Sequence, residues 1–168
     1  MPPKYPVVVP GVGPVPALGM IVGEAPGRNE IEQGIPFCGR SGDLLDDALR
    51  SGASSRAEFY ITNVYKGDVG SGNPNPTQEQ IQDHWPLLRR EIADVAPRGI
   101  LLLGRVATEA FFHEVGRMAD AIAQQAVAEG VRCFPCWHPS YVLRGGGHGV
   151  RAVEFYETIG RFIEYIRD

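Results

Sequence analysis

Short apolar runs alternate with longer segments of helical periodicity along most of this chain. Four runs have the character of buried strands, namely residues 18–22, 59–64, 99–103 and 131–136. Apolar residues recur with the spacing of amphipathic helices in four further segments, at 44–49, 77–95, 106–111 and 152–166. Strands that alternate with helices pair in parallel. The pattern therefore predicts an α/β protein, a three-layer αβα sandwich with a central, mainly parallel four-stranded sheet.

Three stretches lie outside this alternation. Residues 1–17 are rich in proline and valine, and we expect an extended N-terminal arm on a single domain spanning residues 1–168. Residues 24–42 and 66–76 are rich in glycine and proline and are predicted to be loops. Long loops in a compact domain usually serve a function or are disordered. Pro86 is expected either to kink the helix predicted at 77–95 or to divide it.

Composition narrows the class of protein. The chain has 168 residues, of which 43% are hydrophobic and 21% charged, as is ordinary for a globular protein. Its net charge of −4 gives no sign of nucleic-acid binding, yet an acidic average does not exclude a basic groove. No apolar stretch approaches the roughly 20 residues of a membrane span, and the proline-rich start lacks the order of a signal peptide. Three cysteines suit a reducing compartment, so we expect a cytoplasmic protein. We also expect it to be a monomer without membrane contact.

Two polar side chains follow predicted strands that lie far apart in the sequence. Glu24 belongs to the segment Gly-Glu-Ala-Pro-Gly directly after the first strand, and His138 follows the fourth. Open α/β sheets bind their ligands at the carboxyl ends of strands, so both residues are candidates for catalysis. Each also has a plainer interpretation. Glu24 is then a solvated residue of a tight turn, and His138 a structural histidine beside a proline.

Four motifs in this order carry a family resemblance. They are Gly-Glu-Ala-Pro-Gly at 23–27, Gly-Ile-Pro-Phe-Cys-Gly at 34–39, Ile-Thr-Asn-Val at 61–64 and His-Pro-Ser-Tyr-Val-Leu-Arg at 138–144. With them, residues 18–144 resemble the uracil-DNA glycosylase superfamily, and most closely its family-4 enzymes of bacteria and archaea. The resemblance implies a monofunctional glycosylase that flips uracil out of single- or double-stranded DNA. It would hydrolyse the N-glycosidic bond and leave an abasic site for base excision repair.

The resemblance also assigns roles to individual residues. His138 stabilises the departing base anion, while Glu24 stabilises the sugar cation or positions water. Phe37 forms the floor of the base pocket, and the amide of Asn63 matches the acceptor O4 and donor N3–H of uracil. Without the resemblance, Phe37 is equally well a core aromatic and Asn63 a turn-capping residue. The expected site has catalytic Glu24 and His138, base-binding Gly23, Ala25, Gly27, Phe37 and Asn63, and DNA-binding Gly39, Ser41, Ser140, Leu143 and Arg144.

The chain departs from family 4 where those enzymes bind an iron–sulfur cluster through four cysteines. Residues 1–17 contain neither of the two N-terminal cysteines, and the third and fourth positions correspond to Gly67 and His84. The cluster is therefore predicted to be absent, and we expect no cofactor and no metal. Cys133 and Cys136 offer no replacement, because residues three apart on a strand point to opposite faces of the sheet.

Two further departures bear on the chemistry. In the best-known family of the superfamily, an aspartate at the position of Ala25 orients the attacking water, and a tyrosine at the position of Gly27 blocks 5-methyl groups. Glu24 is then the remaining carboxylate candidate, as in family 4, and the pocket wall is more open. No lysine nucleophile stands in a motif, so we expect no strand cleavage. Two alternatives stay open: a glycosylase for another deaminated or modified base, and a non-catalytic DNA-binding module of the same fold.

Overall fold

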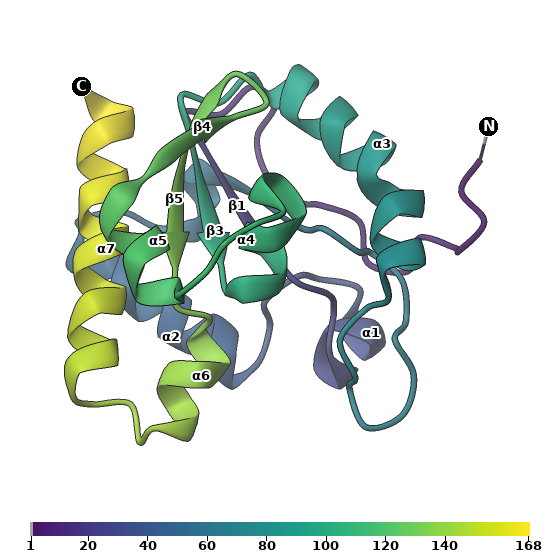
Figure 1. Cartoon of the computed structure of the whole chain (residues 1–168), viewed down its shortest axis with the longest axis horizontal. Coiled ribbons are helices and arrows are strands. Elements are labelled where there is room, and N and C mark those ends of the chain that lie inside the picture. The colour runs from purple at the N-terminus through teal and green to yellow at the C-terminus, as the bar shows by residue number, and fades with distance from the viewer. Residues whose placement is uncertain (1) are drawn as a thin grey trace.

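The sheet at the centre of the molecule is built from five strands (Figure 1). The computed structural model describes residues 2–168 of the chain. In chain order the strands are β1 (Gly19–Gly23), β2 (Phe59–Asn63), β3 (Gly99–Leu103), β4 (Ala126–Ala128) and β5 (Val131–Cys136). Their spatial order is β2-β1-β3-β5-β4, with β4 antiparallel to β5 and the other neighbours parallel. The α/β class and the mainly parallel sheet are confirmed, whereas the predicted number of four strands is wrong.

The strand that the sequence pattern missed is β4, a three-residue strand at the edge of the sheet. Its middle residue, Val127, is 59% exposed, so β4 lacks the buried apolar run by which the other strands were identified. β4 forms a hairpin with β5 through Glu129 and Gly130, whose φ angles are 52° and 75°. A strand this short is specified by its turn and its partner rather than by hydrophobic periodicity.

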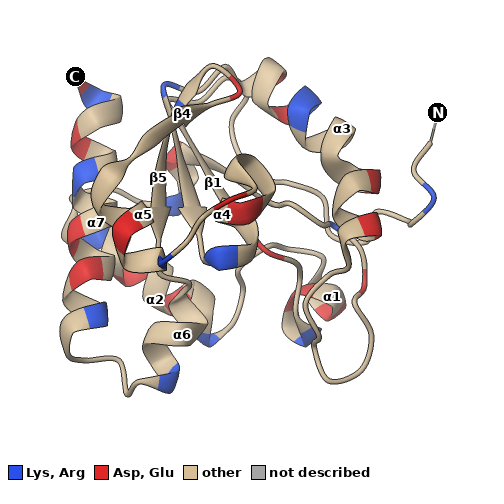
Figure 2. Cartoon of the chain, in the orientation of Figure 1, with Lys and Arg blue, Asp and Glu red and all other residues tan. Residues whose placement is uncertain are grey.

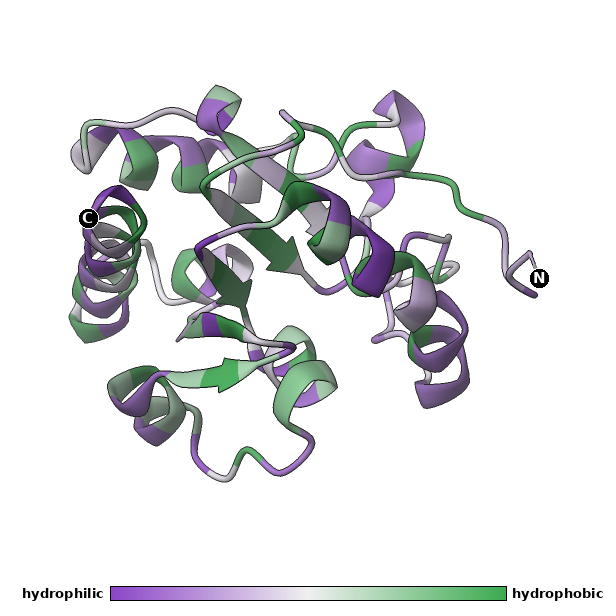
Figure 3. Ribbon diagram, turned by 90° about the horizontal axis from the view of Figure 1, so that it is seen from above, coloured by the Kyte–Doolittle hydropathy of each residue, from purple (hydrophilic) through white to green (hydrophobic). Residues whose placement is uncertain are grey.

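The central strands are apolar because both of their faces are covered. Every residue of β1 and β3 is buried, as parallel strands between two layers of helices require. β1 contains no charged residue and is tan throughout in Figure 2. Seen from above, hydrophobic positions gather on the strands and on the inner sides of the helices (Figure 3).

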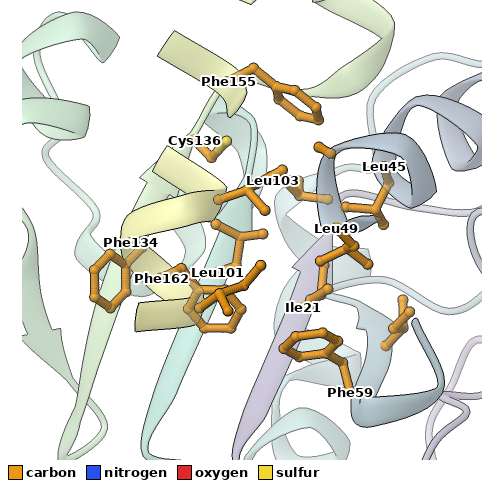
Figure 4. Close-up of a cluster of buried hydrophobic side chains, with 14 of the residues drawn as sticks. Ile21, Leu45, Leu49, Phe59, Leu101, Leu103, Phe134, Cys136, Phe155 and Phe162 are labelled. Atoms are coloured by element: carbon orange, nitrogen blue, oxygen red, sulfur yellow. The ribbon is translucent and has the colours of Figure 1, made fainter. Parts of the chain in front are cut away.

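Helices cover both faces of the sheet. One face packs against α2 (Arg40–Ser51) and α7 (Val150–Arg167), and the other against α3 (Gln78–Val95) and α4 (Arg105–Phe112). Three short helices, α1 (Arg28–Gln33), α5 (Met118–Gln124) and α6 (Pro139–Arg144), lie in the connections. The core under α2 and α7 is rich in large side chains (Figure 4), and burying one of them contributes about 1.5–3 kcal/mol. They include Leu45, Leu49, Phe59, Phe134, Phe155 and Phe162.

Two short helices were not predicted. The loop predicted at 24–42 contains α1 and the first turn of α2. Residues 139–144, for which no element was predicted, form α6. α1 and α6 have six residues each, too few to establish a helical period in the sequence. Pro86 lies inside the single helix α3, so it does not divide that helix.

The N-terminal arm runs along the β2 side of the sheet. Val12 forms an isolated antiparallel bridge with Ile61 of β2. The backbone N–H groups of Val8 and Val9 both donate to the carbonyl oxygen of Lys66, at 2.9 Å each. These bonds tie the arm to the loop that follows β2. None of the helices within residues 2–168 has the length and hydropathy that crossing a bilayer requires.

The order of the strands places a crevice at one edge of the sheet. The chain passes from β1 to β2 on one side and then crosses to β3 on the other, so the strand order reverses beside β1. Open α/β sheets bind ligands outside the carboxyl ends of the strands at such a reversal. The segments after Gly23, Asn63, Leu103 and Cys136 all meet at this edge.

Candidate active site

The carboxyl ends of the four parallel strands open into a cleft of about 970 Å³. Gly104 and Arg105 after β3 line it together with the segments after β1, β2 and β5. The predicted site residues in its lining are Glu24, Ala25, Gly27, Phe37, Ser41, Asn63, His138, Ser140 and Arg144. Gly23, Gly39 and Leu143 lie outside the lining. The fold thus brings together residues that are more than a hundred positions apart in the chain.

His138 is held by the helix that it caps. At the N-terminus of α6, its Nδ1 accepts a hydrogen bond from the backbone N–H of Ser140 at 3.1 Å. The Ser140 hydroxyl lies 2.7 Å from the same nitrogen. Because a backbone N–H can only donate, Nδ1 is the acceptor and the proton of the neutral ring stands on Nε2. Within residues 2–168 nothing hydrogen-bonds to Nε2, so this N–H is free to donate to a ligand in the cleft.

Burial and one arginine set the protonation of the two candidate catalytic groups. Burial, assisted by the charge of Arg144, lowers the pKa of His138 to about 4, so its ring is neutral at physiological pH. Burial raises the pKa of the half-buried Glu24 carboxyl, while Arg144 opposes this rise. Arg144 therefore favours the deprotonated form of both groups, which is a neutral imidazole at His138 and an ionised carboxylate at Glu24.

Phe37 packs tightly against the end of β1. A Cβ at Gly23 would collide with the Phe37 ring and lie 2.6 Å from Asn63 Oδ1, so only glycine fits at this strand end. The ring centroids of Phe37 and His138 are 6.0 Å apart. Phe37 has a φ of 54°, in the left-handed region that residues with a side chain rarely adopt. Backbone strain of this kind clusters at functional sites.

Two charged residues that the sequence analysis did not single out hold the Phe37 loop. The carboxylate oxygens of Glu30 accept the N–H of Gly27 at 2.8 Å and the N–H of Cys38 at 3.1 Å. Arg56 donates to the carbonyl oxygen of Phe37 at 2.6 Å. Glu30 reaches back to the N–H of the N-cap residue Gly27, which is the half of a capping box that a glycine allows. The three-residue spacing of Gly27 and Glu30 is the sequence signal by which this contact could have been found. The contact of Arg56 with a loop 19 residues away has no local signal.

Lys66 holds the backbone of Asn63, and the side-chain amide of Asn63 is free to bind a ligand. The side chain lines the cleft and makes no hydrogen bond within the described chain, residues 2–168. The carbonyl oxygen of Asn63 accepts from Lys66 Nζ at 2.6 Å, and the same ammonium pairs with Glu91 at 2.7 Å. Glu91 also accepts the Tyr60 hydroxyl at 2.6 Å. Burial lowers the pKa of Lys66, and Glu91 opposes this, so the ammonium is held by its partners rather than by water.

Protein atoms crowd Gly67 and His84, the two positions at which the resemblance to family 4 implies cluster cysteines. A Cβ at Gly67 would collide with the hydroxyl of Tyr65, so a cysteine ligand does not fit there. His84 is fully buried, donates from Nε2 to the carbonyl oxygen of Tyr5 at 2.8 Å, and accepts at Nδ1 from the N–H of Lys66 at 3.0 Å. The residues present therefore do not fit a cluster, and His84 instead joins the arm to the loop after β2.

The cysteines of β5 do not form a metal site. Cys133 lies in the core under α3 and α4, whereas Cys136 lies in the core under α2 and α7, on the opposite face of the sheet. This is the separation that their spacing predicts. Burial raises the pKa of both thiols, that of Cys133 to about 12. Within residues 2–168 there is no group of three or more potential metal ligands.

Comparison with known proteins identifies the family. A family model described as the uracil DNA glycosylase superfamily matches residues 10–159. A type-4 uracil-DNA glycosylase of Pyrobaculum aerophilum is 37% identical, over 81% of this chain and 73% of the relative. The type-4 enzymes of Archaeoglobus fulgidus and Thermotoga maritima are 34% and 32% identical, over 80% and 87% of this chain and 71% and 77% of the relatives. With its strand-end cleft and these matches, the chain belongs to the uracil-DNA glycosylase superfamily, as its motifs indicate.

Proposed function

We propose that this protein is a monofunctional uracil-DNA glycosylase. One observation carries the proposal: the free Nε2–H of the neutral His138 ring lies in the same cleft as the open amide of Asn63 and the ring of Phe37. A flipped base needs a stacking surface and a group that reads its edge, and its excision needs a donor for the developing anion.

The base is recognised by stacking and by its edge. Uracil stacks on Phe37, a contact of the kind that contributes about 1–3 kcal/mol per base. Its O4 and N3–H pair with the donor and the acceptor of the Asn63 amide. Cytosine presents the reverse pattern at both positions, which leaves unsatisfied polar groups in the pocket and disfavours binding. Lys66 supports this selection because it fixes the backbone of Asn63.

The chemical step breaks the bond between the sugar carbon C1′ and the base nitrogen N1. The electron pair leaves with the base, and its negative charge spreads to O2, where the Nε2–H of His138 donates. The ionised Glu24 carboxylate stabilises the positive charge that forms on the sugar. Water then adds its hydroxyl to C1′, and its remaining proton neutralises the uracil anion. The products are free uracil and an abasic site.

The DNA strand lies along the rim of the cleft. Ser41 and Arg144 supply hydrogen-bond donors for phosphates there, and the N-terminus of α2 after Gly39 faces the same rim. Ser140 lies beside them with its hydroxyl on His138 Nδ1, so its hydroxyl oxygen is left to accept from water at the DNA backbone. Leu143, at the end of α6, fills the space that the flipped base leaves in the stack.

A wider base range is the second candidate function, favoured by the absence of a side chain at Gly27 in the cleft wall. A Cβ there would lie 2.8 Å from Glu30 Oε1, so the glycine also serves the bond that Glu30 makes to its N–H. Oligonucleotides carrying uracil, hypoxanthine, xanthine or a 5-substituted uracil, each treated with alkali after incubation, separate the two candidates.

The proposal is tested by His138→Ala in single-turnover excision at saturating enzyme. Losing one preorganised donor typically costs about 100–1,000-fold in rate, whereas affinity for uracil-containing DNA should change little. His113→Gln, at an exposed histidine after α4, is the control and should excise at the parent rate. An unchanged rate in His138→Ala would overturn the mechanism. A parent that binds DNA but excises no base would be a non-catalytic module.

A further inference from the structure

A cluster of two aromatic rings and two arginines stands at the rim of the cleft. The rings of Trp137 and Tyr141 are stacked, with centroids 5.2 Å apart and planes at 26°. The guanidinium carbon of Arg151 lies 5.1 Å from the centroid of each ring. That of Arg144 lies 5.8 Å from the centroid of Tyr141. All four residues line the cleft, and we call them the arginine–aromatic rim.

A glycine-rich turn brings the two arginines to the same ring. Arg144 ends α6 and Arg151 is the second residue of α7, with only a short loop between the two helices. Gly146 and Gly147 in this loop have φ angles of 90° and 74°, which favour glycine. The loop reverses the chain, so α7 begins beside α6 at the lower edge of the molecule in Figure 1.

The charges of both arginines are left for a ligand. Among residues 2–168, no carboxylate lies within 4.0 Å of either guanidinium, although Arg56, Arg105 and Arg167 each have such a partner. Figure 2 shows blue segments at the end of α6 and the start of α7. In a chain with a net charge of −4, two unpaired cations beside one ring form a local positive site.

The contacts of Arg151 with the two rings leave its hydrogen-bond donors available. The guanidinium carbon lies over both rings, and among residues 2–168 its N–H groups donate no hydrogen bond. The π electrons of the rings hold the cation without using these donors. Five such donors in a rigid fork match the oxygens of a phosphate. The carboxylate nearest in sequence, Glu154, accepts the indole N–H of Trp137 at 3.3 Å and so supports the ring rather than the arginine.

We propose that Arg151 and Arg144 form a clamp for the phosphate backbone of the uracil-containing strand beside the flipped nucleotide, with Trp137 and Tyr141 as its rigid support. This inference rests on the proposed function for the identity of the strand. It adds Arg151 and the two rings to the expected DNA contacts, and it makes Tyr141 a positioning residue for Arg151.

The test is the salt dependence of DNA binding by Arg151→Ala. A lost phosphate contact lowers the magnitude of the slope of log K against log salt by about 0.7 for single-stranded DNA. At low salt we expect the dissociation constant to rise about 5- to 20-fold, in line with loss of one charge-assisted contact. Arg161→Ala, which removes the same charge from α7 away from the cleft, is the matched control and should keep the parent slope and affinity.

A second pair of variants tests the support. Tyr141→Phe keeps the ring and should bind like the parent, whereas Tyr141→Leu keeps the bulk without a π face and should reproduce part of the Arg151→Ala loss. Combining Tyr141→Leu with Arg151→Ala should add little to Arg151→Ala alone, because both act through one contact. Fully additive losses would show that the ring does not position Arg151.

The outcomes separate this proposal from the proposed function. The experiment uses two strands of equal length, one with uracil and one without. A clamp on the backbone lowers the slope on both, so a parent that excises nothing yet shows this change would lose the proposed function and keep the clamp. A parent slope in Arg151→Ala overturns the clamp. A loss of rate that persists at saturating enzyme also overturns it, since Arg151 would then act in the chemical step.

Discussion

Two positive sites flank the cleft, and they use their charges in different ways. Lys66, behind Asn63, is buried with its ammonium between Glu91 and a backbone carbonyl oxygen. Arg151, at the rim, is exposed and has no carboxylate within 4.0 Å in the described chain, residues 2–168. The charge of Lys66 is neutralised by partners within the protein, whereas the charge of Arg151 is available to a ligand. A cation beside an active site thus indicates ligand binding only when no carboxylate of the protein is paired with it.

The largest expected effect is on stability and comes from the buried cation. Lys66→Met leaves Glu91 without its ammonium partner, and breaking a buried ion pair costs about 3–5 kcal/mol. The side chains of Lys66 and Glu91 are only 4% and 14% exposed, so water does not replace the lost partner. Urea unfolding of Lys66→Met measures the loss. Arg151→Met is the matched change at the rim and should cost less than about 0.5 kcal/mol. Equal losses of unfolding free energy in the two variants would contradict the difference proposed between the two cations.

A smaller effect is expected from His138, which lines the cleft. Its pKa falls to about 4 in the folded protein, while the ordinary histidine pKa is about 6.5. The unfolded chain therefore binds more protons between these pH values, so folding stability decreases as pH falls from about 6.5 to about 4. One histidine contributes about 2–3 kcal/mol to this decrease. Unfolding curves of His138→Asn across this range should show a shallower decrease, and a slope equal to that of the parent would contradict the assignment.

The smallest expected effect is that of the Arg144 charge on the pKa values of Glu24 and His138. Arg144→Ala removes the cation that lowers the pKa of both Glu24 and His138, so both pKa values should rise. Each change favours the inactive protonated form at higher pH. The acid limb of the kcat/KM profile should therefore move to higher pH, which a pH series of uracil excision measures. Arg144→Lys keeps the charge and should stay close to the parent, and a shift in the opposite direction would refute the coupling.

Strand ends were the part of the site that the sequence could predict. Glu24 and His138 follow continuous apolar runs, and a parallel sheet necessarily gathers the carboxyl ends of such runs at one edge. The edge strand β4 was missed because its exposed residues carry no hydrophobic pattern. Helix α1 was missed because six residues do not establish a period.

Long-range supports of the site could not be predicted in the same way. Arg56 and Lys66 act on backbone carbonyl oxygens, which carry no sequence signature. Arg151 follows the last predicted strand end in the sequence, but nothing in the sequence indicates its partners, and only the turn of the glycine-rich loop places it over Trp137 and Tyr141. Composition averages such charges away, so the net charge of −4 concealed the positive rim.

The histidine that joins the N-terminal arm to the loop after β2 has a consequence for how the protein is completed. His84 makes both of its hydrogen bonds to backbone groups of the same chain, one at Tyr5 and one at Lys66. The N-terminal arm is therefore joined to this loop by atoms of the polypeptide alone. The joint between the arm and this loop is complete once the chain has folded, through a single buried side chain.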